Sequence, residues 1–318
     1  METNPLILLL QILACSNVPS DSLRYRNHWE VLGVTDHYGL IDTRITLGNT
    51  DLFRQQGQIQ FDHWPQNESA TRHSRLVFRD QLSVDEELHQ TSLGPDHFRI
   101  DPELNAFQMS IKSTQLKASL YVQNGGPQVQ TTTWEGNTGQ WTTDIAVADG
   151  KIQGWIHAGR QGGPIDGRAV VIHREGNAIP PLMANGRARQ DLYLFGQKMS
   201  LGLTIEGPIQ SAWLQIDGAD LDASAAQSTQ LSDTEWKLDF RPNADVVATI
   251  SSLHFDGETN IRDRYLFVER LLLRLWRPDP VRTVAAVRGT VMSDGEETPI
   301  WGVSLVVGSV LLDANQED

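Results

Sequence analysis

The sequence predicts an all-β protein made of two antiparallel β-barrel or β-sandwich domains joined by a Gly/Pro-rich crossover. From Arg24 onward, apolar and polar residues alternate with the two-residue period of a half-buried strand, and Gly, Asp and Asn turns separate the alternating segments. Long stretches with the 3.6-residue period of a helix are scarce. The length of 318 residues is about twice that of a usual single domain. Regular strand-and-turn spacing over such a length is typical of meanders and barrels.

The first domain is expected over residues 24–158. Its predicted strands cover residues 28–34, 39–47, 57–64, 72–78, 98–100, 106–111, 117–123, 129–134, 142–148 and 151–157. The first two flank a turn at Asp36-His37-Tyr38-Gly39. The order of the strands along the chain favours antiparallel pairing of neighbours.

Residues 159–190 are expected to form the crossover between the domains. The composition shifts here towards turn formers, which are Gly159, Gly162-Gly163-Pro164, Gly167, Gly176-Asn177 and Pro180-Pro181. The segment Gly159-Arg160-Gln161-Gly162-Gly163 precedes a proline and does not open a helix, so it is interpreted as a connector and not as a phosphate-binding loop.

The second domain is expected over residues 191–318. Its predicted strands cover residues 192–195, 200–206, 212–216, 236–240, 246–255, 281–292 and 299–312. The last two form a closing hairpin around Ser293-Asp294-Gly295. Residues 265–276, a run rich in Leu and Arg, fit either a helix or a two-faced strand.

Residues 1–23 predict a signal peptide with a lipobox and a polar spacer. The apolar run over residues 6–14 is too short to span a bilayer of about 30 Å at about 1.5 Å per residue, and it has the length of a signal-peptide core. Ile12-Leu13-Ala14-Cys15 resembles the lipobox of bacterial lipoproteins, in which the cysteine receives a lipid. This resemblance implies lipid attachment at Cys15 and an exported, membrane-anchored protein on the periplasmic or cell-surface side. The alternative is a buried N-terminal strand or helix with an inert core cysteine.

Three segments near the start of the first domain carry a resemblance to a known group. They are Trp29-Glu30-Val31, residues 42–50 and residues 57–62. With the two-block organisation, they resemble the opening strands of the tandem lipocalin-like proteins, the group that contains carotenoid 1,2-hydratases and related fungal cyclases. Hydratase-like members carry an Asp-His-x-Trp-Gly turn near the domain junction. This sequence has Ile172-His173-Arg174-Glu175-Gly176 near that place, without the tryptophan.

Composition and motifs argue against several other classes of protein. The 26 basic and 40 acidic side chains give a formal charge of −14, which disfavours binding to nucleic-acid phosphates. The single cysteine rules out an internal disulfide. Nine histidines occur without metal-binding spacing, so we expect neither a metal site nor a cofactor. No Gly-x-Ser-x-Gly elbow or Walker A loop is present.

Tryptophans and histidines supply the candidate site residues. Trp134, Trp141, Trp155 and His157 are close in sequence, and the last two share one strand face because they lie two residues apart. Inward-facing tryptophans line apolar cavities in barrels, so these four are candidate ligand-binding residues, with core filling as the alternative. His157, Asp166 and His173 are candidate catalytic residues, since a carboxylate can tune a buried histidine for acid–base work.

Three functions remain open from the sequence. The first is a lipid-anchored protein that holds an apolar or amphipathic small molecule in a lipocalin-like cavity, with the membrane as its second partner. The second is a hydratase, isomerase or cyclase that acts on an apolar substrate by general acid–base chemistry. The third is a carbohydrate-binding β-sandwich, which would present its tryptophans in a flat row facing solvent.

Overall fold

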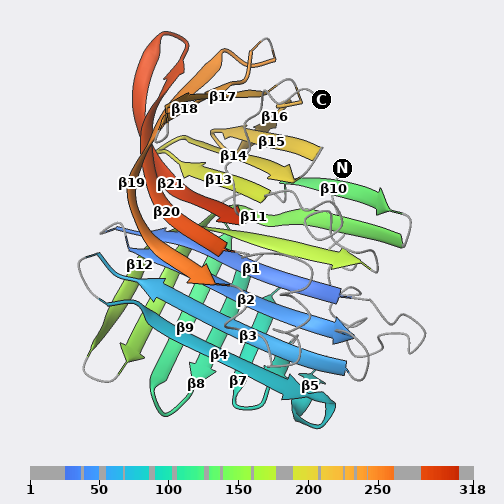
Figure 1. Ribbon diagram of the computed structural model, residues 1–318. Helices are drawn as coiled ribbons and strands as arrows, with labels where there is room; N and C mark the ends of the chain where they lie inside the picture. Colours follow the sequence, from blue (N-terminus) through green and yellow to red (C-terminus); the bar gives the residue numbers. More distant parts are fainter. Residues whose placement is uncertain are drawn as a thin grey trace. The chain divides into compact units, whose positions relative to one another are not determined.

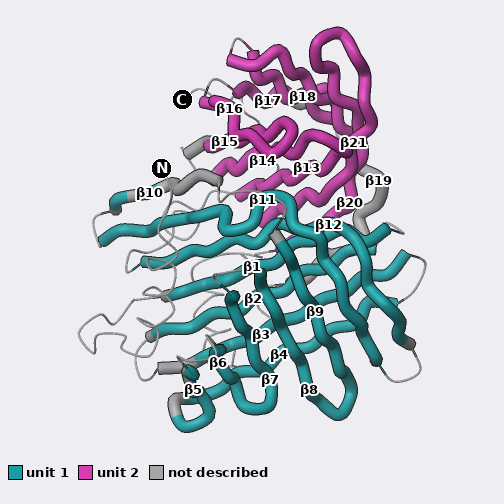
Figure 2. Tube along the Cα trace, turned by 180° about the vertical axis from the view of Figure 1, so that it is seen from behind, with its two compact units in different colours: residues 1–179 teal, residues 180–318 magenta. Residues whose placement is uncertain are grey.

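The computed structural model describes most of the chain from Arg26 to Val307. The described residues are 26–36, 39–49, 55–66, 69–85, 90–101, 106–124, 129–136, 139–158, 161–176, 189–206, 209–224, 226–232, 235–241, 243–260 and 281–307. They form two compact units, residues 1–179 and 180–318 (Figure 2). Cys15 and the ambiguous segment 265–276 lie outside the described residues.

The described part of the chain is almost entirely β-structure, as the sequence predicts. Its helical content is the 3-10 turn η1 (Arg79–Gln81). Among the described residues, no helix has the length and apolar character needed to cross a bilayer.

Unit 1 contains a 12-stranded antiparallel sheet that curls into a nearly closed barrel (Figure 1). The strands are β1 (Arg26–Thr35), β2 (Leu40–Asn49), β3 (Gln55–Trp64), β4 (Thr71–Phe78), β5 (Leu82–Asp85), β6 (Gln90–Leu93), β7 (Asp96–Asp101), β8 (Ala106–Lys112), β9 (Leu116–Asn124), β10 (Val129–Gly136), β11 (Gly139–Ala158) and β12 (Gln161–Gly176). Their spatial order is β4-β3-β2-β1-β12-β11-β9-β8-β7-β6-β5, with β10 paired to β11 off this path. Among the described residues, no backbone ladder joins β4 to β5, the two ends of this order, so the barrel has a seam between β4 and the strands β5–β7.

Alternation along the strands builds the core of unit 1. In β7, Asp96, Phe98 and Ile100 are buried, whereas the residues between them are partly exposed. The inward side chains of the other strands join them in one apolar cluster that includes Trp29 and Phe107. The two-residue period thus sets which side chains can reach an internal site.

The region expected to be the crossover differs from the prediction. Residues 161–176 form β12, which pairs with β11 on one side and with β1 on the other. The first sheet therefore extends beyond residue 158, and only residues 177–188, outside the described part, remain between β12 and β13. The glycines that suggested a connector allow close strand packing: a Cβ atom at Gly167 would lie 2.2 Å from the carbonyl oxygen of Val34.

Unit 2 contains a nine-stranded antiparallel sheet. The strands are β13 (Arg189–Phe195), β14 (Met199–Glu206), β15 (Ile209–Ile216), β16 (Ala219–Leu221), β17 (Gln227–Ser232), β18 (Glu235–Asp239), β19 (Val246–Asn260), β20 (Val281–Ser293) and β21 (Glu296–Val307), in the order β16-β15-β14-β13-β21-β20-β19-β18-β17. The predicted hairpin between β20 and β21 is confirmed: Asp294 and Gly295 adopt φ values of 51° and 79°, which a tight hairpin turn requires.

Candidate functional site

Three adjacent strands of unit 1 bring an aromatic ring, an imidazole and a carboxylate into one row. His173 of β12 lies directly opposite Trp29 of β1 and, on its other side, directly opposite Asp144 of β11. Residues directly opposite each other in antiparallel strands share a face and are close neighbours. Because Trp29 belongs to the buried core cluster, this row lies on the inner face of the barrel.

The His173 ring is fully buried and stacks on Trp29. The ring centroids are 4.2 Å apart and the ring planes differ by 23°. His173 has a relative exposure of 0%, and neither of its ring nitrogens has a hydrogen-bond partner among the described residues. Nδ1 of His173 lies 3.6 Å from Oδ2 of Asp144, slightly beyond hydrogen-bond length. Catalytic hydrogen bonds in unliganded sites are often long and tighten when a substrate binds.

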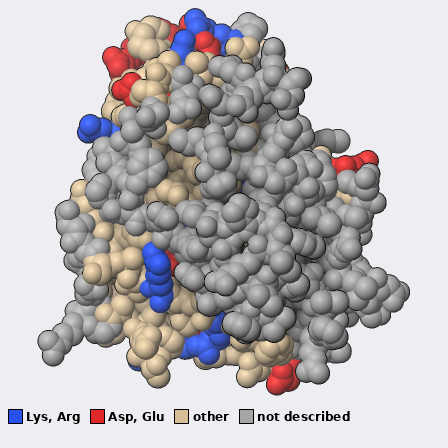
Figure 3. All heavy atoms as spheres, viewed as in Figure 1, with Lys and Arg blue, Asp and Glu red and all other residues tan. Residues whose placement is uncertain are grey.

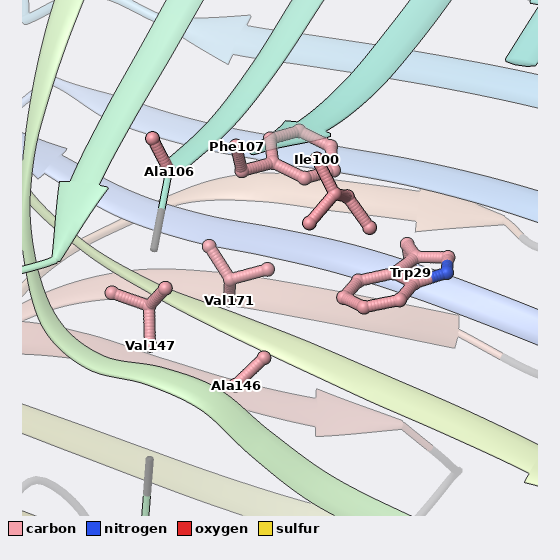
Figure 4. A pocket seen from close by; sticks show the side chains of 7 residues that line it. All are labelled: Trp29, Ile100, Ala106, Phe107, Ala146, Val147 and Val171. Atoms are coloured by element: carbon pink, nitrogen blue, oxygen red, sulfur yellow. The ribbon is translucent and has the colours of Figure 1, made fainter. Parts of the chain in front are cut away.

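The stacked pair continues into an apolar aromatic wall. The Trp29 ring lies 6.4 Å from the Phe107 ring, which lies 6.2 Å from the Phe98 ring. Figure 4 shows side chains of β1, β7, β8, β11 and β12 converging on a small cavity beside this wall. The cavity measures about 20 Å³, close to the space of one water molecule, and its lining is Trp29, Ile100, Ala106, Phe107, Ala146, Val147 and Val171. Any larger guest requires these side chains to repack.

Further polar atoms on the inner face are also without partners. Both amide atoms of Asn27, which lies two residues before Trp29 on β1, have no hydrogen-bond partner among the described residues, and the same holds for Nε1 of Trp29. Buried polar groups normally find a partner, because leaving one unpaired costs about 1–3 kcal/mol. Together with His173, they form a set of donors and acceptors suited to one polar group of an otherwise apolar guest.

Two of the candidate ligand-binding residues do not line the interior. Trp155 is 47% exposed and His157 is exposed, while their neighbour Ile156 belongs to the core cluster. The two side chains share a face, as their spacing predicts, but it is the outer face of β11. The reason is that alternation alone fixes which residues lie together and leaves open which set faces inward.

The other two candidate tryptophans lie opposite each other on β10 and β11. Trp134 of β10 pairs with Trp141 of β11. Trp141 is buried, but it lies three positions before Asp144 on the same strand, so it points to the opposite face and away from the interior. Among the tryptophans whose side chains are described, Trp155 alone is exposed, so these residues do not form the flat row of a carbohydrate platform.

Of the three candidate catalytic residues, the structure places His173 in the interior and the other two outside. Asp166 is exposed, and its Oδ1 lies 3.7 Å from the ammonium nitrogen of Lys151. The carboxylate beside His173 is Asp144, which sequence reasoning missed because β11 has two register shifts in the stretch from Ile145 to Gly150. No group of three or more potential metal ligands occurs among the described residues.

The seam of the barrel is held by a second polar cluster. Arg75 Nε of β4 donates to Oδ2 of Asp96 at 2.7 Å, and His73 Nε2 lies 3.1 Å from the same oxygen. The backbone N–H of Lys112 donates to Oδ1 of Asp96 at 2.7 Å. Burial alone would raise the pKa of Asp96, but the hydrogen bonds from His73 and Lys112 and the charge of Arg75 outweigh it and lower that pKa. Asp96 therefore stays ionised and links β4 to β7 and β8.

His63 lies on the inner face of β3, near the seam cluster. It is opposite the core residue Ile41 and lies two residues after Phe61, which pairs with His73. Burial lowers its pKa to about 4, so the ring is neutral at physiological pH.

Comparisons with known proteins identify the fold. No protein-family model matches the sequence, and no curated protein matches it. The structure of CghA with Sch210972 is similar, with a TM-score of 0.65 and 9% sequence identity over 90% of this chain and 89% of that chain. An AttH-like protein of Nitrosomonas europaea has a TM-score of 0.61 and 10% identity over 92% of this chain and 96% of that chain. Kievitone hydratase from Nectria haematococca has a TM-score of 0.57 and 10% identity over 91% of this chain and 90% of that chain. The class of protein defined here is thus a pair of lipocalin-like β domains. At identities of 9–10%, the likeness to these structures is one of fold alone.

Proposed function

We propose that the protein catalyses an acid–base conversion of an apolar small molecule, such as hydration, isomerisation or cyclisation, inside the barrel of unit 1. The observation that carries the proposal is the fully buried imidazole of His173, which faces the Asp144 carboxylate and has no hydrogen-bond partner among the described residues. A protein that only bound an apolar guest would gain nothing from an imidazole and a carboxylate side by side in its core, since burying them costs free energy.

The two side chains have complementary roles in such a reaction. Asp144 faces Nδ1 of His173, so it orients the ring and stabilises the imidazolium that forms when Nε2 takes a proton. Nε2 then returns the proton to another atom of the same substrate. The aromatic wall of Trp29 and Phe107 excludes bulk water, which strengthens the electrostatic interaction between the two groups. The similar structures include kievitone hydratase and CghA with Sch210972, which supports the proposal by analogy of fold.

The test compares small molecules that copurify with the wild-type protein and with His173→Gln, a neutral variant of similar size. Each protein is extracted with organic solvent, and the extracts are compared by mass spectrometry and chromatography. The proposal predicts that the wild type carries a converted compound and that the variant carries its precursor, which differs by one water or in retention time. Asp166→Asn, a change of an exposed carboxylate, should match the wild type. Identical extracts from wild type and His173→Gln, or no extract from either, contradict the proposal.

Attachment to a membrane through Cys15 is proposed on the lipobox-like segment alone. The change Cys15→Ser should move the protein from the membrane fraction to the soluble fraction of its native host. Unchanged partitioning would refute the anchor.

A further inference from the structure

An open groove lies on the surface of unit 1 at the barrel seam. Its volume is about 650 Å³, and its lining is Arg75, Pro95, Lys112, Ser113, Thr114 and Lys117. The groove is remote from the candidate active site along the strands. Lys117 of β9 pairs with His157 near the end of β11, whereas Asp144 lies near the start of the same strand.

Two lysines in the groove face each other across the strands. Lys112 of β8 is directly opposite Lys117 of β9, and both side chains are exposed. Like charges in this position destabilise an antiparallel pair. The structure gives neither lysine an ion-pair partner among the described residues, while Lys151 and Lys237 each lie near an aspartate. The pair is thus a local excess of positive charge in a chain of net charge −14.

Asp96, a carboxylate beside the groove, is already engaged. Asp96 is buried and accepts from Arg75, His73 and the backbone of Lys112, so it balances the guanidinium and leaves the two ammonium groups uncompensated. The positive charge of Lys112 also adds to the effect of burial in lowering the pKa of His97. On the face shown in Figure 3, charged side chains of both signs are scattered over the coloured surface.

The floor of the groove is preformed. The hydroxyl of Ser113 accepts from the backbone N–H of Leu116 at 2.8 Å and donates to its carbonyl at 3.0 Å, which fixes the turn between β8 and β9. Arg75 Nη2 donates to the carbonyl of Lys112 at 3.3 Å, which holds the guanidinium in place across the seam. The turn that carries Lys112 and Lys117 is therefore ordered before a guest binds, which lowers the entropic cost of binding.

We propose that this groove binds an oxyanion of the phosphate type, carried by a free phosphorylated compound or by a lipid headgroup. Lys112 and Lys117 supply charge-assisted hydrogen bonds to it, and Arg75, which is held by Asp96, borders the groove on the other side of the seam. Because the residues that line the groove come from β8, β9 and β4, a bound anion contacts strands on both sides of the seam. Binding should therefore stabilise unit 1 against unfolding.

The first experiment measures thermal unfolding of the whole protein in inorganic phosphate and in sodium chloride of equal ionic strength. Phosphate should raise the Tm above the value in chloride. The double variant Lys112→Ala/Lys117→Ala should weaken phosphate binding by about tenfold or more, because it removes two charge-assisted hydrogen bonds. The control Lys151→Ala/Lys198→Ala has the same change of net charge at exposed positions outside the groove and should respond to phosphate like the wild type.

The second experiment distinguishes the two sources of the anion. The proteins are sedimented with vesicles of phosphatidylcholine alone or mixed with phosphatidylglycerol. If the wild type and the control bind the mixed vesicles and the groove variant does not, the groove binds a lipid headgroup. If the wild type responds to free phosphate but binds no vesicles, the groove binds a soluble compound. If the groove variant and the wild type behave alike in both experiments, the proposal is wrong.

Discussion

The change Asp96→Asn should destabilise unit 1 strongly. The Asp96 side chain is fully buried, and three groups donate to its oxygens or lie within 3.1 Å of them. An asparagine keeps the shape of the side chain but removes its charge. Its NH2 group, a donor, takes the place of a carboxylate oxygen and therefore faces another donor. Removing one partner of a buried ion pair costs about 3–5 kcal/mol, so we expect a loss of about 3 kcal/mol, since Arg75 keeps some contact with water.

The assay is urea unfolding followed by hydrogen exchange of peptides from β4 and β7, which reports on unit 1 separately from unit 2. The matched control is Asp166→Asn. It removes an ion pair between side chains that are 49% and 58% exposed, and exposed pairs contribute little, so its effect should stay below about 0.5 kcal/mol. A loss of less than about 1 kcal/mol for Asp96→Asn would refute the idea that this cluster holds the seam.

Three further changes test other parts of the structure. The pKa of His63 is about 4 in the folded chain, so the unfolded chain binds a proton below about pH 6.5 and the folded chain only below about pH 4. The free energy of unfolding should therefore decrease by up to about 3 kcal/mol as the pH is lowered through that interval. The change His63→Gln should remove this pH dependence, as measured by urea titrations at several pH values. Gly154→Ala should cost about 2 kcal/mol or more in the same assay, because its Cβ atom would lie 2.0 Å from a carbonyl oxygen of β9; Gly163→Ala, with nothing within 4 Å, should be tolerated, and equal effects would contradict this. Trp29→Ala should lower the free energy of unfolding by about 3–5 kcal/mol and abolish the compound recovered by solvent extraction. Trp155→Ala should change neither the stability nor the recovered compound. Loss of the compound in Trp155→Ala would indicate that the site lies on the outer face.

The sequence allowed most of the architecture to be predicted, because alternation is a direct record of which side chains are buried. The β7 pattern and the Asp294-Gly295 turn are examples in which local chemistry alone determines the element. The short strands β5 and β6 are not predicted from the sequence, since four residues carry too little alternation to be recognised. The strand β12 was interpreted as a connector because its glycines permit both a turn and a close approach of backbones.

The candidate site was predicted only in part. His173 could be singled out from its position near the domain junction and its residue type. Its partner Asp144 could not, because the contact depends on a strand register that two irregularities in β11 shift. The inner position of Trp29 and the outer position of Trp155 likewise depend on which face of each strand closes on the core, and a single sequence does not state this.

The most direct test of the central claim is an activity assay in which the precursor recovered from His173→Gln is added to purified proteins. The wild type should convert it, whereas His173→Gln, Asp144→Asn and the double variant should lose activity to a similar extent, because residues that act as one unit are not additive. Conversion by either single variant at the wild-type rate would contradict an acid–base role for this buried pair.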